Sequence, residues 1–154
     1  YTQFYNVGNF EPIPLKALNF SSMIKHSYHY GASSCQFTYV MLYTDEGIIM
    51  VPFSQKGCVG KLNLVNHQQQ FNGSETDLSV FGTDLSQWTK VSVYTHTDKL
   101  IFRLNEKEIF SFPLAKQSIK IVGVGFFFLG TGSVKNVRFS NGQKAILTDF
   151  LSNS

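Results

Sequence analysis

Residues 88–112, WTKVSVYTHTDKLIFRLNEKEIFSF, decide the fold class of this 154-residue chain. Val91 and Val93 occupy alternate positions, and so do Leu100, Phe102 and Leu104. This spacing is typical of strands that bury one face. Polar turns at 95–99 and 105–108 separate the apolar segments. The stretch therefore predicts a three-stranded antiparallel meander.

The rest of the chain repeats these signals. We predict strands at 19–29, 36–43, 47–53, 59–66, 88–96, 100–105, 108–112, 119–129 and 133–140, with an edge strand at 145–150. Asn72-Gly73 is a strong hairpin signal between apolar segments. These strands are too many for a single sheet, so the sequence predicts an all-β, two-sheet antiparallel β-sandwich. Its core would hold the phenylalanines at alternate strand positions, and Trp88.

The domain organisation follows from two prolines and from the even composition. Pro12 and Pro14 cannot donate hydrogen bonds to a sheet, so residues 1–18 are expected to be an extended N-terminal segment or linker. Residues 19–154 are expected to form a single β-sandwich domain, because no repeat or charge block divides them.

Charge and hydropathy exclude two classes of partner. The net charge is +3 and 15% of residues are charged, against about 25% in an average domain. Arg103 and Arg138 are the two arginines, and the lysines are scattered, so we expect no nucleic-acid partner. Apolar runs are far shorter than the roughly 20 residues that span a bilayer, so we expect no membrane-spanning segment within the chain.

Cys35 and Cys58 leave two alternatives open. A zinc site needs about four ligands, which two cysteines so far apart do not supply. Each precedes a predicted strand, so a disulfide forms if those strands are neighbours, and two buried free thiols remain if they are not. A disulfide would be compatible with an extracytoplasmic location.

Three segments resemble the concanavalin A-like lectin and glucanase superfamily, which includes laminin G-like jelly rolls. They are DLSQWTKV at 84–91, LIFRLNEKEIF at 100–110 and GVGFFFLG at 123–130. Within the superfamily a Trp opens a strand, an Asn-Gly hairpin follows, and a glycine-rich apolar strand comes near the end. Asn105-Glu106 stands here in place of Asn-Gly. The resemblance spans about residues 84–140 and implies a jelly-roll architecture.

The same resemblance bounds the activity. Glycosidases of the superfamily carry Glu-x-Asp-x-x-Glu, because retaining hydrolysis needs two close carboxylates. That motif is absent, and the nearest approach, Glu106-Lys107-Glu108, lies in a predicted hairpin tip. Lectins of the superfamily bind calcium through Asp and Asn, but the five aspartates here fall in turns, where Asp also caps the backbone. We expect no enzyme and no cofactor, with calcium as an unsupported alternative.

Exposed tyrosines are the residues best suited to recognition, because an aromatic ring can cover the apolar face of a sugar. Tyr28 and Tyr30 fall at alternate positions beside a small-residue loop. The second predicted group lies on strand faces and could line a groove: Tyr94, Arg103, Asn136 and Arg138. The four histidines are expected at the surface or at strand edges.

These observations predict a non-catalytic binding module of a larger extracytoplasmic protein, with carbohydrate as the expected ligand. The alternative is a protein-interaction or sensory domain that binds no sugar. A glycoside hydrolase is the third and weakest interpretation.

Overall fold

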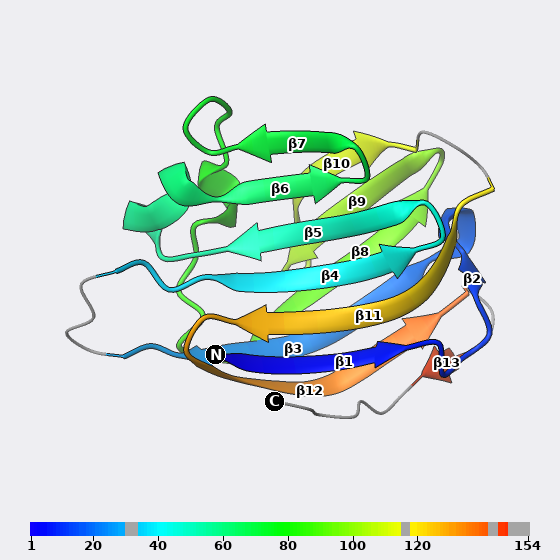
Figure 1. The fold of residues 1–154 in the computed structure, drawn as a ribbon, viewed down its shortest axis with the longest axis horizontal. Helices are drawn as coiled ribbons and strands as arrows, with labels where there is room; N and C mark the ends of the chain where they lie inside the picture. The colour runs from blue at the N-terminus through cyan, green and yellow to red at the C-terminus, as the bar shows by residue number, and fades with distance from the viewer. Residues whose placement is uncertain (30–33, 115–117, 142–144, 148–154) are drawn as a thin grey trace.

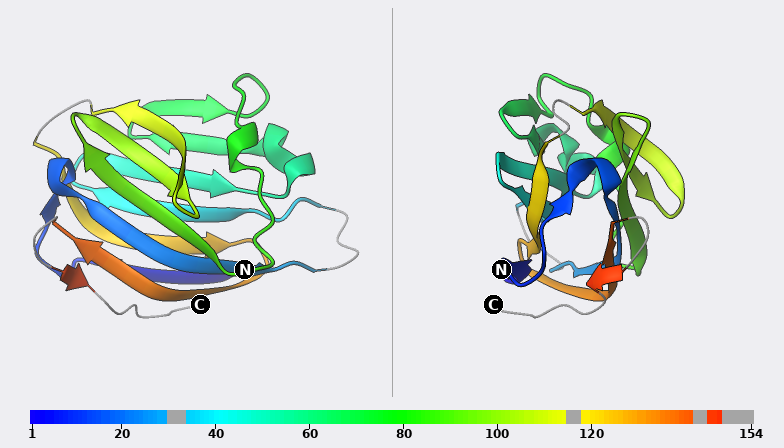
Figure 2. Two further views of the ribbon diagram at one scale, coloured as in Figure 1. Left: turned by 180° about the vertical axis from the view of Figure 1, so that it is seen from behind. Right: turned by 90° about the vertical axis from the view of Figure 1, so that its right-hand side faces the viewer.

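The computed structural model is a sandwich of two antiparallel sheets packed face to face (Figures 1 and 2). It describes residues 1–29, 34–114, 118–141 and 145–147. The seven-stranded sheet contains β1 (Thr2–Val7), β11 (Lys120–Phe128), β4 (Thr38–Thr44), β5 (Gly47–Phe53), β6 (Asn63–Asn66) and β7 (Gln69–Asn72) in this order, with β2 (Ile13–Pro14) also paired to β11. The six-stranded sheet contains β10 (Lys107–Pro113), β9 (Lys99–Leu104), β8 (Thr89–His96), β3 (Asn19–Ser27), β12 (Thr131–Ser140) and β13 (Ala145–Leu147).

The predicted meander is present as β8, β9 and β10, which pair consecutively and antiparallel. Three short 3-10 helices complete the described elements: η1 (Leu15–Ala17), η2 (Lys56–Lys61) and η3 (Ser79–Phe81). No helix in the described ranges is long and apolar enough to cross a membrane. The prediction of an all-β, two-sheet sandwich is therefore confirmed.

The core lies between the sheets and is built largely from phenylalanine. Phe20 on β3 packs against Phe126 on β11, with ring centroids 6.0 Å apart, and so joins the two sheets. Phe102, Phe128 and Phe139 are also fully buried. Burying each such ring contributes roughly 1.5–3 kcal/mol, so these contacts are a main source of stability.

Of the two alternatives for residues 1–18, an extended segment or a linker, the structure contains extended strands that pair within the sandwich. Residues 2–7 form β1, which pairs with β11 from Thr2 opposite Phe128 to Val7 opposite Gly123. Ile13 and Pro14 then pair with the far end of β11. Pro14 is itself opposite Lys120, and Leu15 N donates to Ile119 O, so the prolines do not separate the segment from the sandwich. Pairing between ends of the chain thus makes the first residues an edge of the seven-stranded sheet.

Two local predictions between β5 and β8 are also wrong. The first half of the strand predicted at 59–66 is η2, and the strand begins only at Asn63. The hairpin turn lies at His67, which joins β6 to β7 with a φ of 57°, and not at Asn72-Gly73. Asn72 Oδ1 instead accepts a hydrogen bond from Ser74 N (2.8 Å), and a Cβ at Gly73 would overlap the Val59 carbonyl oxygen. Close contact with η2 therefore explains this glycine.

Candidate functional site

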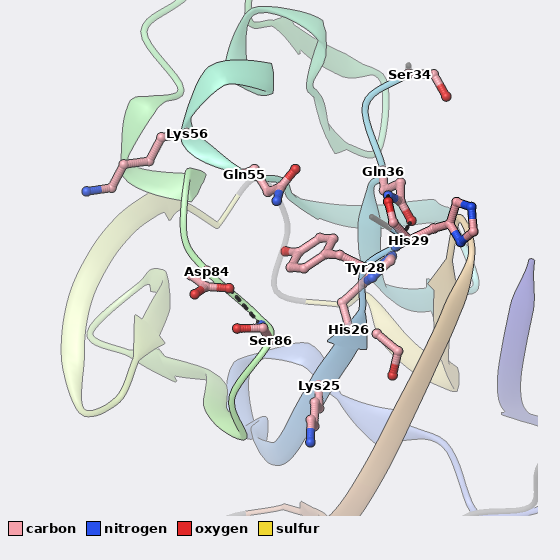
Figure 3. Close-up of a pocket in the computed structure, with 11 residues that line it drawn as sticks. Lys25, His26, Tyr28, His29, Ser34, Gln36, Gln55, Lys56, Asp84 and Ser86 are labelled. Carbon is pink, nitrogen blue, oxygen red and sulfur yellow. Dashed lines mark hydrogen bonds between the residues drawn. The ribbon is translucent and has the colours of Figure 1, made fainter. Parts of the chain in front are cut away.

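A cavity of about 700 Å³ opens at one end of the sandwich, where β3 ends; we call it the end cavity (Figure 3). Four segments contribute to it: the end of β3 with Tyr28 and His29, the segment before β4, the start of η2, and the segment that leads into β8. Its lining residues are Lys25, His26, Ser27, Tyr28, His29, Ser34, Gln36, Gln55, Lys56, Asp84 and Ser86.

Tyr28 stands in the middle of the end cavity. One face of its ring stacks on His26, with centroids 4.3 Å apart and planes 17° apart. Its hydroxyl accepts a hydrogen bond from Leu85 N (3.3 Å). Burial raises the pKa of the phenol, so the group stays neutral at physiological pH. The ring is therefore held in one orientation, and Figure 3 shows its hydroxyl directed toward the wall that carries Asp84 and Ser86.

A disulfide joins two walls of the end cavity. Cys35 and Cys58 are bonded, with 5.8 Å between their Cα atoms, so of the two alternatives the structure contains the bridge. Cys35 precedes Gln36, whose amide donates to the His29 carbonyl (3.2 Å) and accepts from His29 N (3.1 Å). Cys58 lies in η2, which begins next to Gln55. The bridge therefore fixes the spacing between Gln36 and the start of η2.

The opposite wall carries the carboxylate of Asp84. Thr83 N donates to Ser54 O (2.8 Å), which ties this wall to the end of β5. Asp84 Oδ1 accepts a hydrogen bond from Ser86 N (2.9 Å), and this bond lowers the pKa of the carboxyl group. Asp84 is therefore ionised at neutral pH, and its exposed side chain can accept hydrogen bonds from a ligand.

His26 was expected at the surface, and that prediction is wrong. It is fully buried because it follows Phe20 and Ile24 on the inward face of β3. Its Nε2 lies 3.0 Å from Leu129 O, which fits an Nε2–H donor, and Nδ1 has no hydrogen-bond partner among the described residues. Burial lowers the pKa of the imidazole, so it is neutral at physiological pH and acts as a rigid backing for Tyr28.

The second group of predicted residues lies on the outer face of the six-stranded sheet. Tyr94 and Arg103 line a hollow of about 310 Å³, with the guanidinium carbon 4.8 Å from the ring centroid. Arg138 is exposed on β12. Asn136 is exposed at an irregularity of the same strand, with a φ of 53°. Trp88, expected in the core, is half-buried, and Lys135 Nζ lies 4.1 Å from its ring centroid.

The structure therefore divides the predicted site residues between two places. Tyr28 belongs to the end cavity, whereas Tyr94 and Arg103 lie on the outer face of the sheet. Tyr30 lies outside the described residues. Sequence reasoning missed Gln36, Gln55, Asp84 and Ser86, because they come from segments that only the tertiary fold brings to Tyr28. The small and polar residues around Gly82 indicated a turn at that point. They did not indicate that this turn would lie next to Tyr28.

The acidic residues of the described ranges form neither a general acid nor a metal site. Glu106 and Glu108 are exposed in the β9–β10 turn region, and Lys90 lowers the pKa of Glu106 through a hydrogen bond and its charge. Such a carboxyl group stays ionised and cannot serve as a general acid at neutral pH. Within the described ranges, no three His, Cys, Asp or Glu side chains are grouped as a metal would require.

Comparison with known proteins supports the fold. No family model matches the sequence, and no curated protein sequence does either. One similar solved structure is CG-16, a homodimeric agglutinin from chicken liver, with a TM-score of 0.58 and 15% identity over 90% of this chain and 99% of that one. Chicken galectin 2 has a TM-score of 0.55 and 12% identity over 88% of this chain and 100% of that one. The carbohydrate-binding module CBM66 from Bacillus subtilis has a TM-score of 0.55 and 9% identity over 90% of this chain and 96% of that one. The chain therefore shares the jelly-roll β-sandwich fold of these structures, which confirms the architecture that the resemblance over 84–140 implies.

Proposed function

We propose that this chain is a non-catalytic carbohydrate-binding module and that the end cavity holds the sugar. The observation that carries the proposal is the position of Tyr28: an aromatic ring fixed inside a cavity of about 700 Å³ whose other walls are polar. Ligand pockets combine an apolar surface with a few polar groups that fix orientation. A pyranose offers the matching surfaces, an apolar face of C–H groups and a rim of hydroxyls.

Each wall has a defined role in this proposal. The Tyr28 ring covers the C–H face of the sugar on the side away from His26. Gln55 can both donate to and accept from hydroxyls, and the Asp84 carboxylate accepts from them. Lys25 and Lys56 also line the cavity, but Figure 3 shows their ammonium groups directed away from Tyr28. We therefore expect a neutral sugar in this cavity.

Three observations support the non-catalytic role and the location. Asp84 is the one carboxylate among the lining residues of the end cavity, whereas two-carboxylate hydrolysis needs a pair. Similar structures include an agglutinin and a carbohydrate-binding module. A disulfide persists in oxidising compartments, which supports an extracytoplasmic module of a larger protein.

The test is binding of the purified chain to an array of neutral oligosaccharides, followed by calorimetric titration with the best ligand. Tyr28→Ala should reduce affinity at least about tenfold, whereas Tyr28→Phe keeps the ring and should stay within about threefold. Tyr39→Ala is the matched control, because Tyr39 is a half-buried tyrosine on the other sheet. Circular dichroism would verify that each variant is folded.

Two results would contradict the proposal. One is equal sugar binding by Tyr28→Ala and the unaltered chain. The other is an array without any bound glycan, together with a protein ligand whose binding Tyr28→Ala abolishes. That second result would establish the interaction-domain alternative at the same cavity.

A further inference from the structure

The strand register places both arginines of the chain in one row across the six-stranded sheet, in which β9, β8, β3 and β12 are neighbours. Arg103 on β9 is opposite Ser92 on β8, and Ser92 is opposite Ser21 on β3. Ser21 is in turn opposite Arg138 on β12. Four adjacent strands thus contribute one side chain each to the row Arg103–Ser92–Ser21–Arg138.

All four side chains point away from the core. Ser92 lies between buried Val91 and Val93, and Arg138 lies between buried Val137 and Phe139. Side chains alternate between the two faces of a strand, so the neighbours of buried residues are on the outer face. The same alternation places the other two members of the row on this face, since Phe102 and Phe20 are buried beside them.

This face carries more positive than negative charge. Neither arginine is within ion-pair distance of a carboxylate of the described residues. Lys135 adds a cation on β12, while Lys90 is paired with Glu106 at 2.6 Å. Glu108 lies opposite Arg103 on the edge strand β10 and offsets part of its charge. Two separated guanidinium groups therefore remain available for oxyanions, each able to bind one in bidentate fashion.

We propose that this row binds an anionic polysaccharide, at a site separate from the end cavity. Three inter-strand spacings place β9 and β12 about 14 Å apart, which is longer than one sugar and calls for a chain. The arginines would bind sulfate or carboxylate groups, and Ser92, Ser21 and Asn19 would bind the hydroxyls between them. Asn19, Ser21 and Ser92 all line the hollow beside Arg103.

The charge density favours a polysaccharide over a nucleic acid. Duplex binding typically neutralises several phosphates, and its affinity comes mainly from that electrostatic contribution. Here Glu106 lines the hollow beside Arg103 and Glu108 lies opposite Arg103, so both carboxylates oppose a continuous run of phosphates. Two cations separated by hydroxyl groups instead match a polymer in which charged groups alternate with uncharged hydroxyls.

The test uses matched polymers and the whole chain. Dextran sulfate supplies sulfate groups, polygalacturonate supplies carboxylates, and uncharged dextran is the neutral control. Arg103→Gln/Arg138→Gln should weaken binding to at least one polyanion about tenfold or more at low salt. Lys61→Gln/Lys120→Gln removes the same charge from the end of η2 and the start of β11, outside the six-stranded sheet, and binding should stay within about twofold. The affinity should fall as salt increases, and less steeply for the arginine variant.

Arg138→Gln alone keeps the proposal testable if the double variant fails to fold, because Arg138 is exposed. The proposal is overturned if the arginine variants bind like the unaltered chain, if neither polyanion binds at low salt, or if dextran competes equally. If a DNA duplex binds more tightly than both polyanions, the ligand of this row is a nucleic acid and the polysaccharide proposal is overturned. Tyr28→Ala should leave polyanion binding unchanged. The polyanion assay therefore tests the arginine row independently of the sugar-binding proposal for the end cavity.

Discussion

Removal of the Cys35–Cys58 bridge should lower both the stability of the chain and its affinity for sugar. The bridge spans 23 residues of sequence. For a loop of that length, the loss of chain entropy in the unfolded state predicts a loss of about 3 kcal/mol when the bridge is removed. In a domain of this size, 1 kcal/mol shifts the melting temperature by about 2–4 °C, so the expected decrease is about 6–12 °C.

The assay compares thermal melts of the unaltered chain with and without reductant against Cys35→Ser/Cys58→Ser. The reduced chain and the double variant should melt together, and reductant should not change the variant. Sugar affinity should fall too, because the bridge holds the Gln36 wall against the start of η2. A double variant that melts within 2 °C of the oxidised chain would refute the argument that this loop contributes to stability.

Two further outcomes are expected. Gly132→Ala should cost about 1–3 kcal/mol of stability, because a Cβ there would overlap the buried Phe128 ring. Gly60→Ala is the control: its Cβ meets no atom within 4 Å, so stability should stay within about 0.5 kcal/mol. Equal denaturation midpoints for the two variants would contradict the packing argument. Stability should also fall below pH 6.5, by up to about 1.4 kcal/mol per pH unit from His26, because its folded-state pKa is lowered and the unfolded chain binds the proton more tightly. Urea titrations from pH 7 to 5 should show a shallower decline for His26→Gln, and an unchanged decline would exclude His26 as the cause.

Local patterns accounted for much of the fold. Within β8, β9 and β10 each strand pairs with its neighbour in sequence, so alternation and turn residues predicted the meander. The pairing of β1 with β11 could not be predicted in that way, because the partners lie near opposite ends of the chain. The contact between Gly73 and η2 is equally non-local, and it overrode the hairpin tendency of Asn72-Gly73.

The sequence indicated some of the individual residues of the candidate sites, but not which residues the fold would bring together. Tyr28 stood out because it precedes a small polar loop, but the wall that faces it comes from Asp84, more than fifty residues away. His26 was misplaced although the alternation of Phe20 and Ile24 continues through it to the buried face. The alignment of Arg103 with Arg138 depends on the spatial order β9-β8-β3-β12, and no local pattern specifies strand order.

The pairing at the edge of the seven-stranded sheet also bears on synthesis. Thr2 Oγ1 donates to Gly130 O (3.1 Å) across a sequence separation of 128 residues. At about 5–20 residues per second, a ribosome needs about 6–25 s to deliver that partner. Throughout this interval β1 has no partner strand in the nascent chain, although it carries Phe4 and Tyr5 and follows Tyr1. Within this domain, β1 is therefore a segment on which cotranslational aggregation or chaperone capture should act before the sandwich can close.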